Sequence, residues 1–182
     1  DAPKIFADYM ANKATDDAKE AAIAAENKRK QEEAEAQRKA ELKAKYGPVF
    51  EAKAKYLAET KATATETASG LKYKIIQTGT GKKPADGTNV FIHYAGYLED
   101  GTLFDTSDTE VAKQLGKYDE QRAMQGGYTK IAFNIGGQNQ LIPGFVEGIE
   151  KLKVGEKAVL FIPSNLGYGE QGAGKVIPPN AN

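Results

Sequence analysis

Glycine and proline are distributed so unevenly along this chain that they divide it into two parts. Of the 19 glycines among 182 residues, 18 lie at or after Gly70, and residues 4–45 contain neither glycine nor proline. Because both residue types interrupt regular helices, the first part is free to form a long helix, whereas the second must contain many turns. We place the boundary between residues 66 and 67.

The first part, residues 1–66, is dense in Ala, Lys, Glu, Gln and Arg, which have high helix propensity. Acid-before-base pairs four residues apart, such as Glu26 and Lys30, add about 0.2–0.5 kcal/mol each to an exposed helix. We therefore predict a charged, alanine-rich helical arm. Gly47-Pro48 predicts a break or a kink in the arm, and the Thr-rich residues 60–69 indicate a linker.

Larger apolar residues of the arm cluster only near its ends, at Ile5, Phe6, Tyr9 and Met10 and again between residues 42 and 57. These clusters favour a homodimer contact or a contact with an upstream domain. An alanine stripe with heptad spacing ends at Lys28, where a coiled coil needs apolar residues, so a solvated spacer is the alternative. The chain begins with Asp1 rather than Met, and we expect that an upstream segment has been removed.

Composition excludes several classes of partner. Residues 1–69 carry 13 basic and 13 acidic side chains and residues 70–182 carry 12 of each, so no basic surface indicates nucleic acid binding. No apolar run approaches the roughly 18–20 residues needed to span a bilayer. The chain has no cysteine, which is compatible with a reducing or an oxidising compartment. We expect a cytoplasmic or periplasmic protein that is not an integral membrane protein.

The second part, residues 67–182, has the periodicity of several strands and one short helix. Strand patterns occur at residues 71–75, 90–98, 102–105, 131–135 and 158–162, and the last is apolar throughout, which predicts burial on both faces. Residues 144–150 place Phe145 and Ile149 on one helical face. The order predicts an α+β fold with an antiparallel sheet. Residues 108–130 interrupt the pattern as an insertion, with a short helix around residues 110–115.

The inventory of reactive groups is small. His93 is the only histidine, no cysteine is present, and no spacing typical of a metal site, a phosphate loop or a dinucleotide site occurs. We interpret His93 as a packed or exposed strand residue rather than a catalyst. A reaction that needs no cofactor, metal or covalent intermediate is rotation about an X–Pro bond, whose barrier of roughly 18–20 kcal/mol falls when the imide loses double-bond character.

Four motifs in residues 70–182 resemble, in the same order, those of the FKBP-type peptidyl-prolyl cis–trans isomerase family. They are VFIHYAG at 90–96, DGTLFDTS at 100–107, LIPGF at 141–145, and LGYG at 166–169 continuing to IPPN at 177–180. The resemblance implies a twisted antiparallel sheet wrapped around the short helix, with a proline-binding pocket between them. It also implies proline-containing polypeptides as substrates.

The resemblance also implies the residues of the pocket. The catalytic set is Tyr94, Phe104, Asp105, Ile142, Phe145 and Tyr168, and the substrate-binding set is Leu141, Ile131, Phe133, Val176 and Ile177. By this resemblance Phe145 forms the floor and Asp105 is the polar group on the wall. The backbone N–H of Ile142 and the hydroxyl of Tyr168 would donate hydrogen bonds to substrate carbonyls.

The chain departs from the family pattern at several points. Phe145 stands where many members have tryptophan, Ile131 replaces an aromatic residue, and Ala173 occupies a position that is often histidine. We expect these changes to shift sequence preference and to weaken binding of macrolide inhibitors. The insertion replaces a short bulge, and Arg122 is its only arginine. Members of the family continue after the paired prolines with another strand, and we expect this domain to lack that strand.

Two functions follow from these observations. The first is an isomerase that acts by desolvation and hydrogen bonding in an apolar pocket. The alternative is a non-catalytic chaperone or peptide-binding module with a dimerising helical arm. Asp105 and Tyr168 favour the first function, whereas the arm and the insertion leave room for the second.

Overall fold

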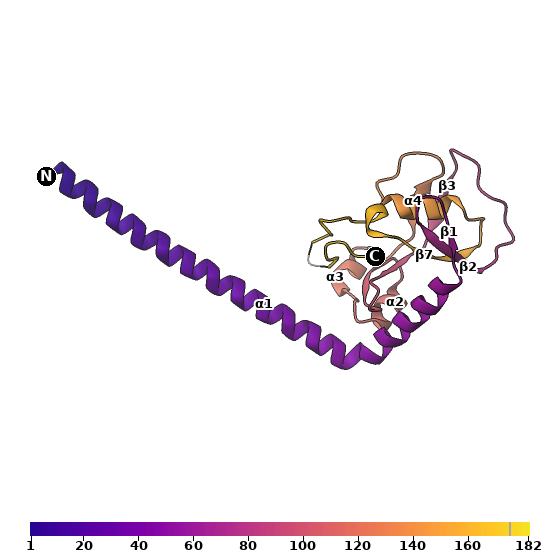
Figure 1. Cartoon of the computed structure of the whole chain (residues 1–182), viewed down its shortest axis with the longest axis horizontal. Coiled ribbons are helices and arrows are strands. Elements are labelled where there is room, and N and C mark those ends of the chain that lie inside the picture. Colours follow the sequence, from indigo (N-terminus) through magenta and orange to yellow (C-terminus); the bar gives the residue numbers. More distant parts are fainter. Residues whose placement is uncertain (175) are drawn as a thin grey trace. The chain divides into compact units, whose positions relative to one another are not determined.

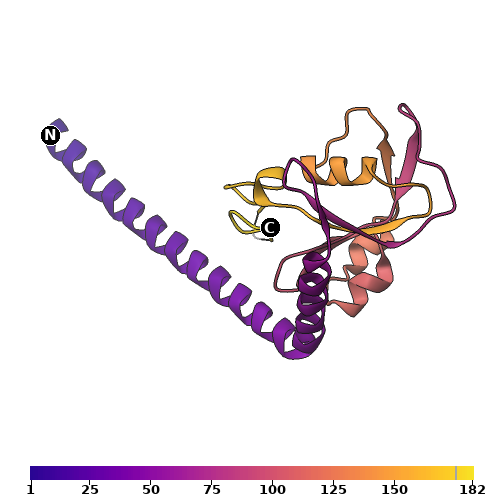
Figure 2. The ribbon, with the colours of Figure 1, turned by 45° about the vertical axis from the view of Figure 1, so that its right-hand side comes forward.

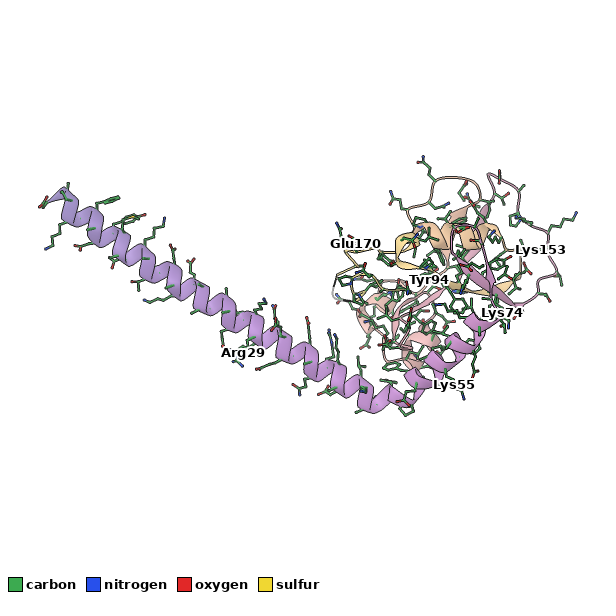
Figure 3. The ribbon with its side chains drawn as sticks, in the orientation of Figure 1. Arg29, Lys55, Lys74, Tyr94, Lys153 and Glu170 are labelled. Carbon is green, nitrogen blue, oxygen red and sulfur yellow. The ribbon has the colours of Figure 1, made fainter. Side chains whose placement is uncertain are left out.

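The computed structural model describes residues 1–174 and 176–182, and the chain forms two compact units, residues 1–45 and 46–182. The first unit belongs to helix α1 (Ala2–Ala62), drawn in indigo and purple in Figure 1. On its exposed surface the Arg29 guanidinium, labelled in Figure 3, pairs with the carboxylates of Glu26 and Glu33. Pairs three and four residues apart support an exposed helix. α1 is too polar to cross a bilayer, and the other described helices are too short.

Helix α1 runs through Gly47-Pro48, so the dipeptide does not end the helix. Proline in a helix interior costs about 3 kcal/mol or more. The surroundings of the final turns offset this cost: Phe50 is buried, and the Lys53 ammonium lies 4.9 Å from the centroid of the Tyr97 ring. The end of the helix therefore belongs to the larger unit, whose boundary falls upstream of the predicted one.

The segment after α1, predicted to be a linker, contains a short strand. β1 (Thr65–Glu66) pairs with β2 (Lys72–Gln77), which pairs with β7 (Lys157–Phe161), and both pairings are antiparallel. The Ser69 hydroxyl also donates to both carboxylate oxygens of Glu147, at 2.8 and 2.6 Å. β7 is half-buried rather than buried on both faces, because it lies at the edge of this sheet.

Two further antiparallel pairs complete the strands. β3 (Asn89–Ile92) pairs with β6 (Ile131–Asn134), and β4 (Ala95–Tyr97) pairs with β5 (Leu103–Thr106). With these pairings and the long amino-terminal helix, the predicted α+β class is confirmed.

The strand predicted at residues 90–98 is two strands, because the chain changes its partner at His93-Tyr94. The backbone N–H of Tyr94 donates to the Ser107 hydroxyl at 2.9 Å, and its carbonyl accepts from the Thr106 hydroxyl at 2.8 Å. Thr106 and Ser107 are both fully buried. These side chains satisfy the Tyr94 backbone where the regular ladder is interrupted.

Helix α4 (Pro143–Glu150) lies on one side of the strands, and α2 (Thr109–Gln114) and α3 (Glu120–Met124) lie on the other (Figure 2). Under α4, the buried core consists of Phe133, Ile135 and Ile149, with Phe145 and Val146 packed against it. α2 and α3 are the helices of the insertion. The first matches the predicted helix, and the second was not predicted. A short 3-10 helix (Ser164–Leu166) follows β7.

Candidate active site

Asp105, on β5, is the polar centre of the site. Its Oδ2 accepts a hydrogen bond from the Tyr94 hydroxyl at 2.6 Å. Its Oδ1 accepts from Arg122 Nη1 at 2.8 Å and from the backbone N–H of Thr106 at 2.9 Å. The Asp105 and Arg122 side chains are 39% and 35% exposed. Both carboxylate oxygens are therefore engaged, and the carboxylate is held in one orientation at the edge of solvent.

The surroundings keep Tyr94 neutral. Partial burial raises the pKa of Tyr94 to about 12, and the hydrogen bond to the Asp105 carboxylate acts in the same direction, opposed by the charge of Arg122. The hydrogen bond to Asp105 likewise raises the pKa of Arg122 above its ordinary value. At neutral pH the phenol keeps its proton and donates a hydrogen bond to the carboxylate, and the guanidinium remains charged.

Aromatic rings form the apolar part of the site. The Tyr94 and Phe145 rings meet edge to face with centroids 6.3 Å apart, and the Phe104 and Tyr168 rings do so at 6.5 Å. This arrangement is favourable for aromatic pairs. Gly96 lies directly against the Phe104 ring, and an added Cβ at this position would overlap it. The fold thereby assembles four rings from separate segments of the chain.

Two hydrogen-bond donors remain open. Ile142 precedes α4 in an extended conformation, and its carbonyl accepts from the N–H groups of Phe145 and Val146 at 3.1 and 3.2 Å. Within residues 1–174 and 176–182, no acceptor pairs with the Ile142 N–H or the Tyr168 hydroxyl. Tyr168 is 40% exposed. Both donors are available to a polypeptide ligand.

Most of the predicted residues line one continuous hollow, which also extends toward α1, β2 and β7. They are Tyr94, Phe104, Asp105, Ile131, Leu141, Ile142, Phe145, Tyr168 and Ile177. In Figure 3, Tyr94 is labelled within the densely packed part of the larger unit.

Two predicted substrate contacts lie elsewhere. The Phe133 side chain has 0% exposed surface and belongs to the core, so it offers nothing for a substrate to contact. Its position on β6 directs it beneath α4. Val176 is 44% exposed and lies outside the hollow, so its contact stays a prediction.

Sequence reasoning gave no role to several residues around the carboxylate. Arg122 was noticed only as the arginine of the insertion, and Tyr128 was not singled out. In the structure the Arg122 guanidinium carbon lies 4.5 Å from the centroid of the Tyr128 ring. Thr106 and Ser107 lie in the motif at residues 100–107, but no function was predicted for their hydroxyls. Only folding of the insertion back onto β5 reveals the contacts of Arg122 and Tyr128.

His93 lies on the exposed side of the turn between β3 and β4. Its Nδ1 is 3.0 Å from the Ser107 hydroxyl, and no carboxylate among the described residues contacts the ring. No cluster of three or more metal-ligating side chains occurs in the described part of the chain. The chemistry that the site offers is therefore apolar contact, two open donors and a fixed carboxylate.

Comparisons with known proteins place this geometry in context. A family model described as FKBP-type peptidyl-prolyl cis-trans isomerase matches residues 80–182. The probable FKBP-type peptidyl-prolyl cis-trans isomerase FkpA of Neisseria meningitidis is 44% identical over 115 residues, which cover 63% of this chain and 35% of that protein. FK506-binding protein 1 of Dictyostelium discoideum is 41% identical over 112 residues, covering 62% and 88%.

A solved structure extends the comparison to the fold. The crystal structure of a peptidyl-prolyl cis-trans isomerase from Pseudomonas syringae superposes with a TM-score of 0.50 at 27% identity, covering 75% of this chain and 86% of that chain. The matched part of this chain spans only about a third of the Neisseria relative.

Proposed function

Because this chain belongs to the family of FKBP-type peptidyl-prolyl cis-trans isomerases, we propose that residues 46–182 accelerate rotation about X–Pro bonds in polypeptides. The observation that carries this proposal is the convergence of four aromatic rings and the fixed carboxylate of Asp105 on one hollow. These groups suit a reaction that makes and breaks no covalent bond.

Desolvation supplies the first part of the mechanism. The planar imide has partial double-bond character and a large dipole, whereas the twisted imide in the transition state has lost the resonance between nitrogen and carbonyl. Water stabilises the planar form more than the twisted one. A pocket lined by Phe104, Phe145 and Ile177 excludes water around the proline and so favours the twisted form.

Hydrogen bonds to the flanking peptide supply the second part. The Ile142 N–H and the Tyr168 hydroxyl have no intramolecular acceptor among the described residues, and both groups border the hollow. We assign them to carbonyl groups of the substrate on either side of the rotating bond. Holding those carbonyls in place confines the rotation to the X–Pro bond.

Asp105 contributes by fixing Tyr94. Its Oδ2 holds the phenol, and the Tyr94 ring then meets Phe145 edge to face. The wall and the floor of the pocket are thereby set relative to each other before a substrate binds. Such preorganisation lowers the cost of reaching the transition state.

The test is the rate of cis–trans exchange of a short Leu-Pro peptide, measured by NMR exchange spectroscopy with the whole chain. We expect catalysis by the intact chain and its loss in Phe145→Ala, while Ile23→Ala on the exposed arm leaves the rate unchanged. Circular dichroism and urea unfolding verify that Phe145→Ala is folded. Absence of catalysis by the folded intact chain would refute the isomerase proposal and leave a peptide-binding module.

The arm offers a separate contact surface. Ile5, Phe6, Tyr9 and Met10 are 46–68% exposed near the start of α1. We propose that a second copy of this chain covers this apolar cluster. Sedimentation equilibrium of the whole chain and of a Phe6→Glu, Tyr9→Glu variant tests this: a dimer that becomes a monomer in the variant supports the contact, and equal masses refute it.

A further inference from the structure

The insertion between β5 and β6 is built around a single cation. The Arg122 guanidinium donates from Nη1 to Asp105 Oδ1 at 2.8 Å, from Nη2 to the Thr106 carbonyl at 3.1 Å and from Nε to the Gly127 carbonyl at 3.1 Å. All three nitrogens of the fork are engaged. These bonds fix the guanidinium within its own plane.

The face of the guanidinium is covered by an aromatic ring. The Arg122 guanidinium carbon lies 4.5 Å from the centroid of Tyr128, a half-buried residue after the Gly126-Gly127 bend. A cation over an aromatic face is attracted by the ring's quadrupole, and more strongly the further it is removed from water. The three hydrogen bonds do not restrain movement of the guanidinium out of its own plane. Tyr128 restrains that movement.

The Tyr128 ring is itself held by two other parts of the insertion. The Tyr118 ring stacks on it with centroids 5.7 Å apart and an interplanar angle of 12°. The Tyr128 hydroxyl accepts the backbone N–H of Asp119 at 2.9 Å. Asp119 caps α3, the helix that carries Arg122, by accepting from the Arg122 N–H at 3.2 Å. The ring and the backbone of the arginine are thus positioned by the same turn.

On the outer side of this stack, the Lys113 ammonium lies 5.0 Å from the centroid of Tyr118. A continuous series of contacts runs from α2 to the pocket floor: Lys113, Tyr118, Tyr128, Arg122, Asp105, Tyr94 and Phe145. In this series Tyr128 contacts Arg122, and Arg122 pairs with the Asp105 carboxylate.

We propose that Tyr128 is a positioning residue, which holds Arg122 against Asp105 and so fixes the orientation of Tyr94 over the pocket. This inference rests on the proposed isomerase function, because its catalytic effect is read through that activity. It assigns a function to the insertion at residues 108–130: the insertion supplies the support for the polar wall of the site.

The first experiment compares Tyr128→Leu, Tyr128→Phe and the exposed control Met124→Leu in the peptide exchange assay. Tyr128→Phe keeps the ring face, so we expect kcat/KM within twofold of the original. Tyr128→Leu removes the face, and a cation–π contact of this kind corresponds to a fall of about five- to tenfold. The fall should lie mainly in kcat, because the apolar pocket that binds the proline is unchanged. Equal effects of the two Tyr128 substitutions would overturn the proposal.

A double-mutant cycle separates positioning from general damage to the insertion. Residues that act through one another give non-additive effects. In an Arg122→Ala background, Tyr128→Leu should therefore lower kcat/KM by less than twofold further. The same five- to tenfold fall in both backgrounds would show that Tyr128 acts by a route that does not include Arg122.

A spectroscopic readout needs neither catalysis nor a stable Tyr128→Leu variant. In the unmodified chain, the Arg122 Nε–H and Hδ protons should show upfield ring-current shifts, retained in Tyr128→Phe and lost in Tyr128→Leu where that variant folds. Unshifted Arg122 protons in the unmodified chain would refute the positioning contact. A shifted signal in a chain without isomerase activity would instead refute the proposed function while leaving the contact standing.

Discussion

The Tyr94 hydroxyl donates to Asp105 Oδ2 at 2.6 Å, and this bond connects the two segments that form the polar side of the site. Tyr94 lies between β3 and β4, where the strand ladder changes partner, and Asp105 lies on the paired strand β5. The bond supplies a side-chain link where the backbone ladder is interrupted. Its removal should therefore affect both stability and catalysis.

Tyr94→Phe removes this hydroxyl and leaves the ring in place. A hydrogen bond to a charged group contributes roughly 1.5–3 kcal/mol, and partial exposure of Asp105 reduces this, so we expect the free energy of unfolding to fall by about 1 kcal/mol. Urea unfolding at neutral pH measures the change. Tyr56→Phe, which removes a part-exposed hydroxyl without a hydrogen-bond partner among the described residues, is the matched control and should be neutral.

The surroundings of Tyr94 also predict a dependence on alkaline pH. Partial burial, and after it the hydrogen bond to Asp105, raise the pKa of Tyr94 from 10.0 to about 12 in the folded chain. A raised pKa stabilises the fold fully below the unfolded value, and this stabilisation is lost as the pH rises from 10 toward 12. The stability difference between the original chain and Tyr94→Phe should therefore narrow over this range. Urea unfolding at pH 8, 9, 10 and 11 measures the free energy of unfolding of both chains. A difference between them that stays constant over this range would contradict the raised pKa of Tyr94.

Arg122→Lys tests the geometry of the cation rather than its charge. The planar guanidinium of Arg122 donates to Asp105 and to the carbonyls of Thr106 and Gly127. The single ammonium of a lysine cannot reach all three acceptors. We expect kcat/KM to fall by about tenfold, a barrier increase of about 1.4 kcal/mol, with the charge retained. Arg38→Lys, on the exposed surface of α1, should have no effect. Unchanged activity in Arg122→Lys would show that charge alone suffices.

Local sequence pattern predicted most of the elements, but it missed β1 and α3 and did not predict where several elements end. Apolar periodicity located the strands and α4, because burial of one face imposes that periodicity on any sequence. Gly47-Pro48 predicted a break or a kink, and the helix does not end there; local propensity does not include the burial of Phe50 that follows it. Thr65 in β1 was assigned to a linker for the same reason, because its strand partner lies beyond the following turn.

The site shows the same division. Its aromatic residues lie in short motifs and were predicted from resemblance, and Phe133 was included although its alternation on β6 directs it into the core. The contact between Arg122 and Asp105 spans 17 residues and depends on how an insertion folds back. A contact of this kind produces no periodic pattern in the sequence. Its discovery required the structure.

Gly101→Ala tests whether the end of α1 is part of the larger unit, with Gly87→Ala as its control. The two glycines have positive φ angles of 87° and 86°, so alanine suffers the same backbone strain of about 1–2 kcal/mol at each. An added Cβ at Gly101 overlaps the Phe50 carbonyl of α1, whereas nothing lies within 4 Å of one at Gly87. Gly101→Ala should therefore reduce the free energy of unfolding by at least 1 kcal/mol more, as overpacking does. Equal losses in urea unfolding would show that the helix end moves aside without cost.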